Sequence, residues 1–420
     1  MKALRGTTDL YSPEIERWQK VESIARELFR LFGFQEIRTP ILEETALFSR
    51  SVGDQTDIVQ KQMYTFLDRG ERSVSLRPEG TASVVRAYLE HRFDLHLPEM
   101  GRLFYIGPMF RAERPQAGRS RQFHQIGAEI LGSYQPYADS ELLQWIWLFF
   151  ERLGLSGARL KINSLGCQKD KKALEEFLRR QLSSAKGLLC EDCQTRFEKN
   201  VFRILDCKNK ECRAICEKLP PFFEKLCADC QDHFRTLKNL LQKSEIPFVE
   251  DPHLVRGLDY YTRTAFEITH TALGAQDALG AGGRYDTLVE TLGGPATGAV
   301  GFAVGLERLL MALEFKLFEP TEPSELFLVA VGEGTQEAVS VLLADLRRRG
   351  ISAQMDYQNR SLKSQMRLAD RLRVRYVFIV GEEELKSGQG ILKEMAQGKE
   401  QRISLGDLKK LHEIVEEKKG

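Results

Sequence analysis

The chain has 420 residues, 42% of them hydrophobic, which predicts two or three domains with sizeable cores rather than one. Its formal net charge is only +1, which excludes a protein with a basic surface throughout; any nucleic acid must be bound by local patches. No run of about 18 apolar residues occurs, and residues 1–14 (MKALRGTTDLYSPE) lack the apolar core of a secretion signal. We therefore expect no membrane span and a cytoplasmic protein.

The first predicted element is a helix that begins at Ser12 and ends at Gly33. Ser is a favoured N-cap residue, and the Pro that follows it suits the first helical position. Apolar residues then recur at helical spacing. The alternation in Phe34–Pro40 predicts a strand, and further helices are expected at Thr81–His91 and Asp139–Leu153.

A strand, a polar loop and a second strand are predicted next, at Arg102–Arg111, Ala112–Arg121 and Gln122–Gly132. The loop carries three arginines, a Pro and a Gly, so it should be exposed. Side chains alternate along a strand, so one face of the second strand carries Phe123, Gln125, Gly127 and Glu129. Buried Gln and Glu are unfavourable unless they are paired. This face is therefore either a binding site or a structural hydrogen-bond network.

The segment from about Gly166 to Ile246 differs from its surroundings. It is helical, charged and rich in cysteine, whereas a strand-like sequence resumes at His253–Thr269. We therefore expect 166–246 to be a helical insertion in a larger domain. At Val300–Phe315 a strand is predicted to lead into a helix.

Strands and helices alternate after Pro320, which predicts a small α/β domain with a partly parallel sheet. The expected strands and helices are, in order, Glu325–Val331, Gln336–Arg349, Ile351–Asp356, Ser361–Leu372, Tyr376–Val380 and Leu405–Glu417. The predicted domains are thus 1–320, interrupted by 166–246, and 324–420.

The usual phosphate-binding loops are missing from the sequence. It contains no G-x-x-x-x-G-K-[ST], and no G-x-G-x-x-G between a strand and a helix. If the protein binds ATP, arginines must hold the phosphates, since guanidinium groups bind phosphate bidentately. Arg111, Arg121 and Arg308 are the candidates, and Phe123 could stack on the base. A lone Arg is ordinarily a surface charge, so the prediction depends on their joint pattern.

Seven of the eight cysteines fall between Cys190 and Cys230. Two C-x2-C pairs are typical of a structural zinc site, and its candidate ligands are Cys190, Cys193, Cys227 and Cys230. Cys207 and Cys212 are an alternative second pair. Reduced thiols packed between helices are the other interpretation. A redox C-x-x-C is less favoured, because no thioredoxin-like βαβ pattern surrounds either pair, and Cys167 is expected to be structural.

Three blocks of the sequence resemble the three motifs of class II aminoacyl-tRNA synthetases. They are the long helix and strand that end in Arg38-Thr39-Pro40, the hairpin FR-AERPQAGRSR-QFHQIGAE, and GFAVGLERLL at Gly301–Leu310. Two further blocks are similar to histidyl-tRNA synthetases: LVRGLDYYTRTAFE at Leu254–Glu267 and ALGAGGRYD at Ala278–Asp286. SLRPEGT at Ser75–Thr81 also fits. The resemblance covers essentially the whole chain and is weakest in the cysteine-rich insertion.

This resemblance implies an α+β catalytic domain built on an antiparallel sheet, with a helical insertion and a C-terminal α/β domain like those that bind the anticodon. It implies that the enzyme is a histidine–tRNA ligase that activates L-histidine with ATP and Mg²⁺ and transfers it to the 3′ end of tRNA(His). The first motif implies a homodimer interface. The family does not require a metal in the insertion, so zinc is predicted from the cysteine spacing alone.

The resemblance also assigns residues to the site. Arg256 and Arg111 are implied as catalytic. The implied histidine-binding residues are Glu79, Gly80, Thr81, Arg111, Gln125, Glu129, Arg256, Tyr260, Tyr261 and Tyr285. The implied ATP-binding residues are Arg111, Glu113, Arg121, Phe123 and Arg308. The loop residues Gln116 and Arg119 are implied to contact the acceptor end of the tRNA.

Three alternatives stay open at the level of sequence. A related protein with this fold is the histidine-sensing regulatory subunit of ATP phosphoribosyltransferase, which does not catalyse. Its role would require neither the set Arg111, Arg256 and Arg308 nor the C-terminal domain, and both are present. A class II synthetase for another amino acid is disfavoured by Glu129 together with the Tyr260–Tyr261 pair. A nucleotide-binding protein without catalysis is the third.

Overall fold

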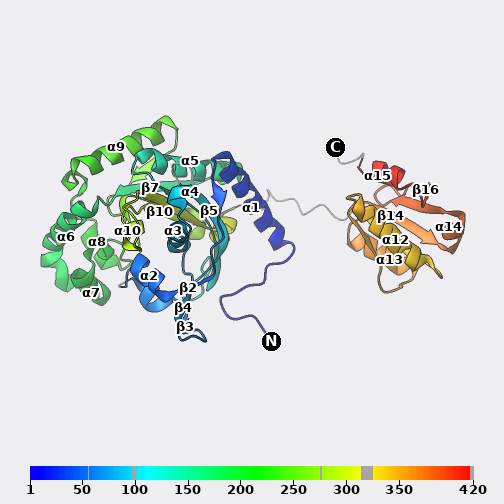
Figure 1. Cartoon of the computed structure of the whole chain (residues 1–420), viewed down its shortest axis with the longest axis horizontal. Coiled ribbons are helices and arrows are strands. Elements are labelled where there is room, and N and C mark those ends of the chain that lie inside the picture. Colours follow the sequence, from blue (N-terminus) through cyan, green and yellow to red (C-terminus); the bar gives the residue numbers. More distant parts are fainter. Residues whose placement is uncertain (55, 97–100, 275–276, 314–324, 417–420) are drawn as a thin grey trace. The chain divides into compact units, whose positions relative to one another are not determined.

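The computed structural model describes residues 1–54, 56–96, 101–274, 277–313 and 325–416. The chain forms two compact units, Met1–Phe318 and Glu319–Gly420 (Figure 1). Several predicted boundaries lie outside the described residues: the end of Val300–Phe315, the domain bounds at 320, 324 and 420, and Glu417. Among the described residues, no helix combines the length and the apolar character that a membrane span needs.

The larger unit is built on an eight-stranded sheet. In spatial order its strands are β1 (Gln35–Glu36), β5 (Gly101–Phe110), β6 (Gln122–Leu131), β11 (Ala299–Gly305), β10 (Ala278–Arg284), β9 (Thr262–His270), β7 (Ala158–Ser164) and β8 (Phe248–Glu250). The strands between β5 and β7 pair antiparallel, and only the edge strands β1 and β8 pair in parallel with their neighbours. The predicted antiparallel sheet is therefore confirmed.

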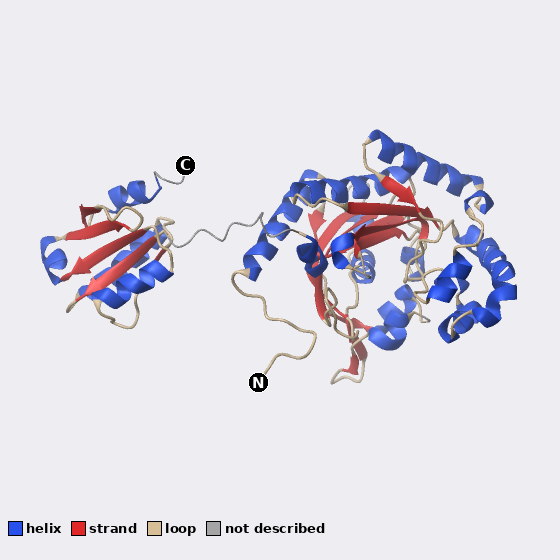
Figure 2. Ribbon diagram, turned by 180° about the vertical axis from the view of Figure 1, so that it is seen from behind, coloured by secondary structure: helices blue, strands red, loops and turns tan. Residues whose placement is uncertain are grey.

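Three amphipathic helices cover one face of this sheet: α1 (Glu14–Leu31), α5 (Pro136–Arg152) and α9 (Ala228–Lys243). Figure 2 shows the strands in red with helices packed against them. Aromatic side chains form the centre of this core. The ring of Phe29 stacks on Trp145, with centroids 4.0 Å apart, and on Phe104, with centroids 4.2 Å apart.

Two details of the first motif differ from the prediction. Helix α1 begins at Glu14 after Pro13, and no side-chain cap bond is present, so the predicted Ser12 cap is wrong. The strand predicted over Phe34–Pro40 is only two residues long. It pairs with Leu103 and Phe104 of β5, and the chain then leaves the edge towards Pro40, which has no N–H to donate.

The cysteine-rich segment forms four helices: α6 (Gln168–Leu182), α7 (Glu191–Lys199), α8 (Lys210–Cys216) and α9 (Ala228–Lys243). Of these, α6, α7 and α8 lie together in Figure 1, while α9 runs beside α5. Short 3-10 turns occur at Ser183–Leu188, Val201–Ile204 and Phe223–Lys225. The helical character predicted for 166–246 is confirmed.

The remaining elements of the larger unit are short. A three-stranded antiparallel sheet consists of β2 (Leu42–Glu44), β4 (Ser73–Leu76) and β3 (Thr65–Leu67). The helices are α2 (Thr45–Val52), a π-helix at Ile58–Gln62, α3 (Thr81–Glu90), α4 (Phe93–His96), a 3-10 turn at Thr271–Leu273, α10 (Leu288–Thr291) and α11 (Leu306–Ala312). Of these, α3 and α11 carry residues of the site.

The smaller unit is the α/β domain that its alternating sequence predicts. Its sheet has the order β13 (Ala353–Met355), β12 (Leu326–Val331), β14 (Tyr376–Gly381), β15 (Gln389–Glu394) and β16 (Glu400–Ser404). The first three strands are parallel, and β15 and β16 add an antiparallel hairpin that the sequence analysis missed. The helices are α12 (Thr335–Arg348), α13 (Leu362–Arg371), α14 (Glu382–Ser387) and α15 (Leu408–Glu416).

Candidate active site

Most of the predicted site residues line one cavity of about 420 Å³ in the larger unit. This volume is within the range of small-molecule sites. The predicted residues on its wall are Glu79, Thr81, Arg111, Glu113, Arg119, Phe123, Gln125, Arg256, Tyr260, Tyr261 and Arg308. The predicted residues that are not on its wall are Gly80, Gln116, Arg121, Glu129 and Tyr285.

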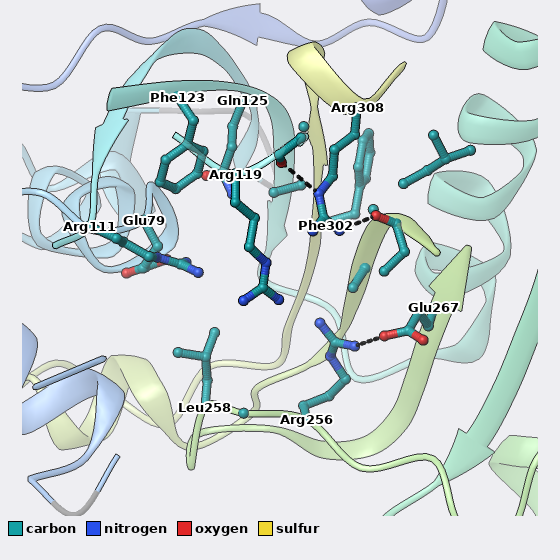
Figure 3. A pocket seen from close by; sticks show the side chains of 18 of the residues that line it. Glu79, Arg111, Arg119, Phe123, Gln125, Arg256, Leu258, Glu267, Phe302 and Arg308 are labelled. Atoms are coloured by element: carbon teal, nitrogen blue, oxygen red, sulfur yellow. Dashed lines mark hydrogen bonds and ion pairs between the residues drawn. The ribbon is translucent and has the colours of Figure 1, made fainter. Parts of the chain in front are cut away.

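Four arginines from separate parts of the chain surround the cavity (Figure 3). Arg111 follows β5, Arg119 lies in the hairpin loop, Arg256 precedes β9, and Arg308 is in the first turn of α11. A cavity with several guanidinium groups and no phosphate-binding loop is suited to a polyphosphate. The arrangement agrees with the sequence argument that side chains, not a backbone loop, would hold ATP.

Arg111 is fixed from two sides. Its Nε donates to the carbonyl oxygen of Pro78 at 2.9 Å, and its guanidinium carbon lies 5.2 Å from the centre of the Phe123 ring. Burial lowers the pKa of Arg111 from its ordinary value, but an arginine stays charged at any physiological pH. Arg111 is therefore a positioned positive charge beside an aromatic ring that faces the same cavity.

Arg256 and Arg308 are also held by neighbours. Arg256 forms an ion pair of 2.9 Å with Glu267 on β9, drawn as a dashed line in Figure 3. Arg308 donates to the carbonyl oxygens of Gly118, at 3.0 Å, and of Ala278, at 2.5 Å. Each contact uses part of the guanidinium group, so further N–H groups are left for a ligand.

Two buried polar atoms on this wall have no partner among the described residues: Oε1 of Gln125 and Nε of Arg256. A buried polar group without a hydrogen bond is destabilising by about 1–3 kcal/mol. Both residues lie on the wall of one cavity, Gln125 within β6 and Arg256 in the loop before β9, so a polar ligand in the cavity could bond with both.

Glu79 lies at the start of α3. Its two carboxylate oxygens accept the amide protons of Thr81, at 2.7 Å, and Ala82, at 2.9 Å. Burial raises the pKa of Glu79, although these amides and Arg111 oppose the shift. Each oxygen keeps a second lone pair, so Glu79 can cap the helix and still accept a hydrogen bond from a ligand.

Behind the wall, Glu129 of β6 accepts three hydroxyl donors. They are Tyr285 at 2.5 Å, Thr81 at 2.7 Å and Tyr105 at 3.5 Å. Glu129 has no exposed surface and, within the described chain, no ion pair. Burial raises its pKa to about 8, and the hydroxyl bonds only partly oppose this shift. The predicted polar face of β6 is thus a hydrogen-bonded network that adjoins a cavity.

Glycines make room for this network. Gly301 of β11 pairs with Glu129, and a Cβ at this glycine would lie 1.6 Å from Glu129 Oε2. At Gly80 a Cβ would lie 2.4 Å from the Tyr105 ring. Gly80 therefore supports the site by its small size and not by lining the cavity.

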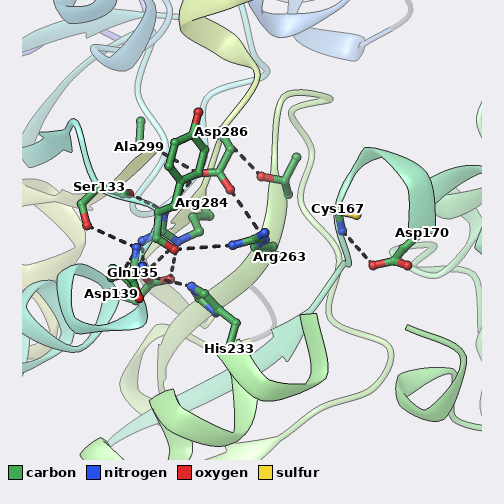
Figure 4. Close-up of polar contacts among 12 residues, drawn as sticks. Ser133, Gln135, Asp139, Cys167, Asp170, His233, Arg263, Arg284, Asp286 and Ala299 are labelled. Carbon is green, nitrogen blue, oxygen red and sulfur yellow. Dashed lines mark hydrogen bonds and ion pairs between the residues drawn. The ribbon is translucent and has the colours of Figure 1, made fainter. Parts of the chain in front are cut away.

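A second polar cluster fixes the end of β10, next to Tyr285 (Figure 4). Arg284 and Asp139 are both fully buried and form an ion pair, with Nε to Oδ2 at 2.9 Å. Arg284 also donates to Asp286 at 3.0 Å and to the carbonyl oxygens of Ser133 and Gln135, both at 2.7 Å. These bonds hold the backbone that presents Tyr285 to Glu129.

Sequence reasoning did not predict several polar residues of the cavity, among them Tyr105, Asp206, Lys208 and Glu267. Tyr105 lies in the predicted strand Arg102–Arg111 and Glu267 in the recognised block Leu254–Glu267, and an alternating strand pattern could have marked both. Asp206 and Lys208 belong to the cysteine-rich segment, and nothing in their spacing pointed to a cavity that is formed by distant strands.

Arg121 and Gln116 lie in the hairpin loop but away from the cavity wall. The side chain of Arg121 packs against Gly6, and the amide of Arg121 donates to the Gly6 carbonyl at 2.7 Å. Gln116 pairs with Arg119 across the tip of the loop, through two backbone hydrogen bonds of 2.9 and 3.1 Å.

The four cysteines predicted as one zinc site do not come together. Cys190 and Cys193 lie with Cys207 and Cys212, whereas Cys227 and Cys230 lie with Cys167 and Asp170. The prediction of a single site from the two C-x2-C pairs is therefore corrected. The alternative second pair, Cys207 and Cys212, is the one that the structure brings to Cys190 and Cys193. The spacing could not show the second group, because Cys167 and Asp170 at the start of α6 meet Cys227 and Cys230 only through the packing of distant helices.

Comparison with known proteins agrees with this architecture. A family model described as histidyl-tRNA synthetase matches residues 6–309, and a model described as anticodon binding domain matches residues 325–414. The histidine–tRNA ligase of Desulforamulus reducens is 47% identical over 406 residues, which cover 96% of this chain and 97% of that protein.

Solved structures add to these matches. The apo histidyl-tRNA synthetase of S. aureus has a TM-score of 0.82 and 36% identity, and the match covers 99% of both chains. A Bacillus halodurans structure titled as an ATP phosphoribosyltransferase regulatory subunit/histidyl-tRNA synthetase covers 90% of this chain and 98% of that one. Its TM-score is 0.65 at 21% identity, so it shares the fold alone. The chain therefore belongs to the histidyl-tRNA synthetase family.

Proposed function

We propose that this cavity activates L-histidine with ATP to histidyl-adenylate and that the enzyme then transfers histidine to the 3′ end of tRNA(His). The chain is a histidine–tRNA ligase by its full-length relation to curated ligases of that name. The observation that carries the assignment to this cavity is the joint placement of four arginines and two unpaired polar atoms on one wall.

The amino-acid end of the cavity would lie near Glu79, Thr81 and Gln125. A substrate ammonium group needs acceptors, and Glu79 offers a buried carboxylate while Gln125 offers its unpaired Oε1. Both are on the wall of the cavity and arise from different elements, α3 and β6. Their separation in the chain would position the ammonium group by two independent contacts.

The imidazole would be recognised by Glu129 and Tyr261, in a pocket shaped by Tyr260 and Tyr285. A neutral imidazole has one donor and one acceptor, so it needs matched polar partners. Glu129 has no exposed surface, so a direct contact requires the hydroxyl of Thr81 or Tyr105 to turn aside when histidine binds. An N–H from the ring would then favour the ionised carboxylate. A site built in this way rejects apolar analogues, because their binding would leave its buried polar groups without hydrogen-bond partners.

ATP would lie along the arginines. We propose that Phe123 stacks on adenine, that Arg111 binds the α-phosphate and that Arg308 binds the γ-phosphate. Arg256 would lie between the histidine carboxylate and the α-phosphate, with its unpaired Nε available to either group. Arg121 and Glu113 are proposed to complete the ATP site, and Gln116 and Arg119 to contact the acceptor end of the tRNA.

The chemistry requires positioning more than covalent help. The histidine carboxylate attacks the α-phosphorus in line and pyrophosphate leaves. A terminal ribose hydroxyl of tRNA then attacks the carbonyl carbon of the adenylate, its proton is lost, and AMP leaves. Arg256 and Arg111 would neutralise charge at the reacting groups in both steps. Enzymes of this family use ATP together with Mg²⁺. That ion takes few protein ligands besides phosphate oxygens and water. Glu113, on the cavity wall 2.9 Å from Arg119, fits such a role.

Other parts of the molecule complete the proposal. We propose that residues 324–420 form the domain that reads the anticodon, that 1–320 form the catalytic domain with 166–246 inserted, and that two copies pair through the first motif in the cytoplasm. The candidate zinc ligands lie outside the cavity and take no part in the reaction proposed here.

A histidine sensor was the alternative left by the sequence, and the fold alone does not separate it from a ligase, whereas the full-length relation to curated ligases favours the ligase. The ATP–pyrophosphate exchange reaction does. Purified full-length protein should exchange pyrophosphate into ATP with histidine and not with the other amino acids. Histidine binding without exchange would support the sensor, and exchange with another amino acid would overturn the histidine assignment.

A further inference from the structure

The cysteine-rich segment contains two separate groups of four ligand atoms. In cluster A, the sulfur atoms of Cys190, Cys193, Cys207 and Cys212 lie within 4.8 Å of one another. In cluster B, the same holds for the ligand atoms of Cys167, Asp170, Cys227 and Cys230. We propose that each cluster binds one zinc ion as a structural site, so that the chain carries two.

The geometry of cluster A fits a single tetrahedral ion. Cys190 occupies the N-cap of α7, Cys193 lies in the first turn of that helix, and Cys212 lies in the first turn of α8. The sulfur atoms of Cys190 and Cys207 are 3.8 Å apart. A tetrahedron with zinc–sulfur distances of about 2.3 Å has edges of about 3.8 Å. A cluster of several irons would stand between its ligands and spread them further apart than this group is spread.

The surroundings of cluster A suit thiolates. Cys193 and Cys212 are fully buried, so bulk water cannot solvate charge on them. The amide of Cys190 donates to the sulfur of Cys212 at 3.3 Å, a contact that stabilises a thiolate. Soft thiolates in a tetrahedral set of four select zinc among the common cellular cations.

Cluster B repeats the design with one carboxylate. Cys167 and Asp170 occupy the N-cap and first turn of α6 at the same spacing that Cys227 and Cys230 have at α9. Asp170 joins the two helices, since its Oδ2 accepts the amide of Cys167 at 3.1 Å (Figure 4) and its Oδ1 accepts the amide of Cys227 at 2.9 Å. Zinc accepts carboxylate oxygen beside sulfur at such sites.

The backbone before α6 is shaped for this approach. Gly166 has φ +71°, and a Cβ at this position would lie 2.5 Å from the Cβ of Asp170. Only glycine therefore allows the chain to turn so closely onto Asp170. All eight cysteines are free thiols, so no disulfide competes for these sulfur atoms.

Each ion would have a distinct structural role. Cluster B links Asp170 to Cys227, which are 57 positions apart, and so closes the two ends of the inserted helices onto each other. Cluster A holds Cys207, whose neighbours Asp206 and Lys208 both line the catalytic cavity. The ion in cluster A would therefore fix one wall of that cavity.

Metal analysis of the full-length protein, purified without chelators, tests the proposal directly. We expect two zinc ions per chain. Cys193→Ser should leave one, from cluster B, and Cys230→Ser should leave one, from cluster A. Cys216→Ser is the matched control, because Cys216 is buried in the same segment but belongs to neither cluster, and it should keep two.

Asp170 allows a sharper test, because its two roles can be separated. Asp170→Asn keeps one oxygen, which can accept one of the two amide protons, but weakens the metal ligand, so it should lose one zinc. Asp170→Cys removes that acceptor but restores a sulfur ligand, so it should keep two. Its cobalt(II)-substituted form should show the visible spectrum of two four-thiolate sites. Two zinc ions in Asp170→Asn together with one in Asp170→Cys would overturn cluster B as a metal site.

Three results would overturn the proposal without any variant. They are less than one zinc per chain, iron in place of zinc, or fewer than eight free thiols in the denatured metal-free protein. A value of one zinc in the unaltered protein would overturn the second site. The link to the cavity predicts that Cys212→Ser lowers histidine-dependent exchange several-fold while Cys216→Ser does not. Unchanged exchange in Cys212→Ser would overturn that link.

Discussion

Two polar clusters are buried side by side in the larger unit, and they are paired in different ways. Around Arg284, opposite charges meet: the guanidinium faces Asp139 and Asp286, and carbonyl oxygens take its remaining N–H groups. Around Glu129, three hydroxyl groups surround one carboxylate, and the described residues give it no ion pair. The clusters adjoin in sequence, because Arg284 belongs to the first and Tyr285 to the second.

The difference separates structure from binding. A buried ion pair with all its hydrogen bonds satisfied has nothing left for a ligand, so the Arg284 cluster is expected to hold the fold. A buried carboxylate without a cation, whose pKa is raised to about 8, is in an unfavourable state that a bound polar ligand can relieve. The next three predictions test this contrast.

The largest effect is expected for Arg284→Met. It leaves Asp139 buried without its partner, which should lower the free energy of unfolding by about 3–5 kcal/mol. All three tryptophans lie in α1 and α5 of the larger unit, so urea unfolding followed by tryptophan fluorescence reports on that unit. Arg92→Met is the control, since its pair with Asp94 is exposed and should contribute less than about 1 kcal/mol. An equal loss of unfolding free energy in both variants would contradict the structural role of the Arg284 cluster.

A smaller and more specific effect is expected for Glu129→Gln. The substitution keeps the volume but removes the charge that an imidazole N–H would favour. The loss of a hydrogen bond to a charged group, about 1.5–3 kcal/mol, should raise the KM for histidine about 10- to 100-fold. The KM for ATP should change little. Ser83→Ala, a buried change on α3 away from the cavity wall, should leave both values as they are. An unaltered KM for histidine would contradict the role of Glu129.

The smallest effect concerns pH and stability in the absence of substrate. Because the pKa of Glu129 is raised from 4.5 to about 8 in the folded state, the folded protein keeps a proton that the unfolded chain releases between these values. Stability should therefore fall as pH rises through this window, and Glu129→Gln lacks this contribution. Between pH 6 and pH 7 the variant should gain up to about 1.4 kcal/mol relative to the unaltered protein. If the difference in unfolding free energy between Glu129→Gln and the unaltered protein does not depend on pH, Glu129 does not have the raised pKa.

Much of this site could be read from the sequence where the information is local. The strand period placed Phe123, Gln125 and Glu129 on one face of β6, and the hairpin around the Ala112–Arg121 loop is present as predicted. The resemblance of separate blocks brought Arg111, Arg256 and Arg308 to one cavity.

Other features depend on contacts between distant residues, which local patterns do not contain. The burial of Arg284 requires Asp139, which is 145 positions away in the chain. The two cysteine clusters depend on how four helices pack; the spacing favoured the two C-x2-C pairs together and gave the observed partners Cys207 and Cys212 only as an alternative. The edge strand β1 is another example. Only Gln35 and Glu36 pair with β5, although the alternation of side chains extends to Pro40.

The central claim is that the polar groups left unpaired on the cavity wall are those that act on histidine and ATP. The most direct test is histidine-dependent ATP–pyrophosphate exchange by Arg256→Ala, with unfolding measured in parallel. Arg86→Ala, which breaks an ion pair with Glu43 away from the cavity wall, is the matched control. We predict that Arg256→Ala lowers exchange about 10²–10³-fold with little change in stability, the typical effect of removing a charge-stabilising donor. Near-normal exchange in Arg256→Ala would contradict the account.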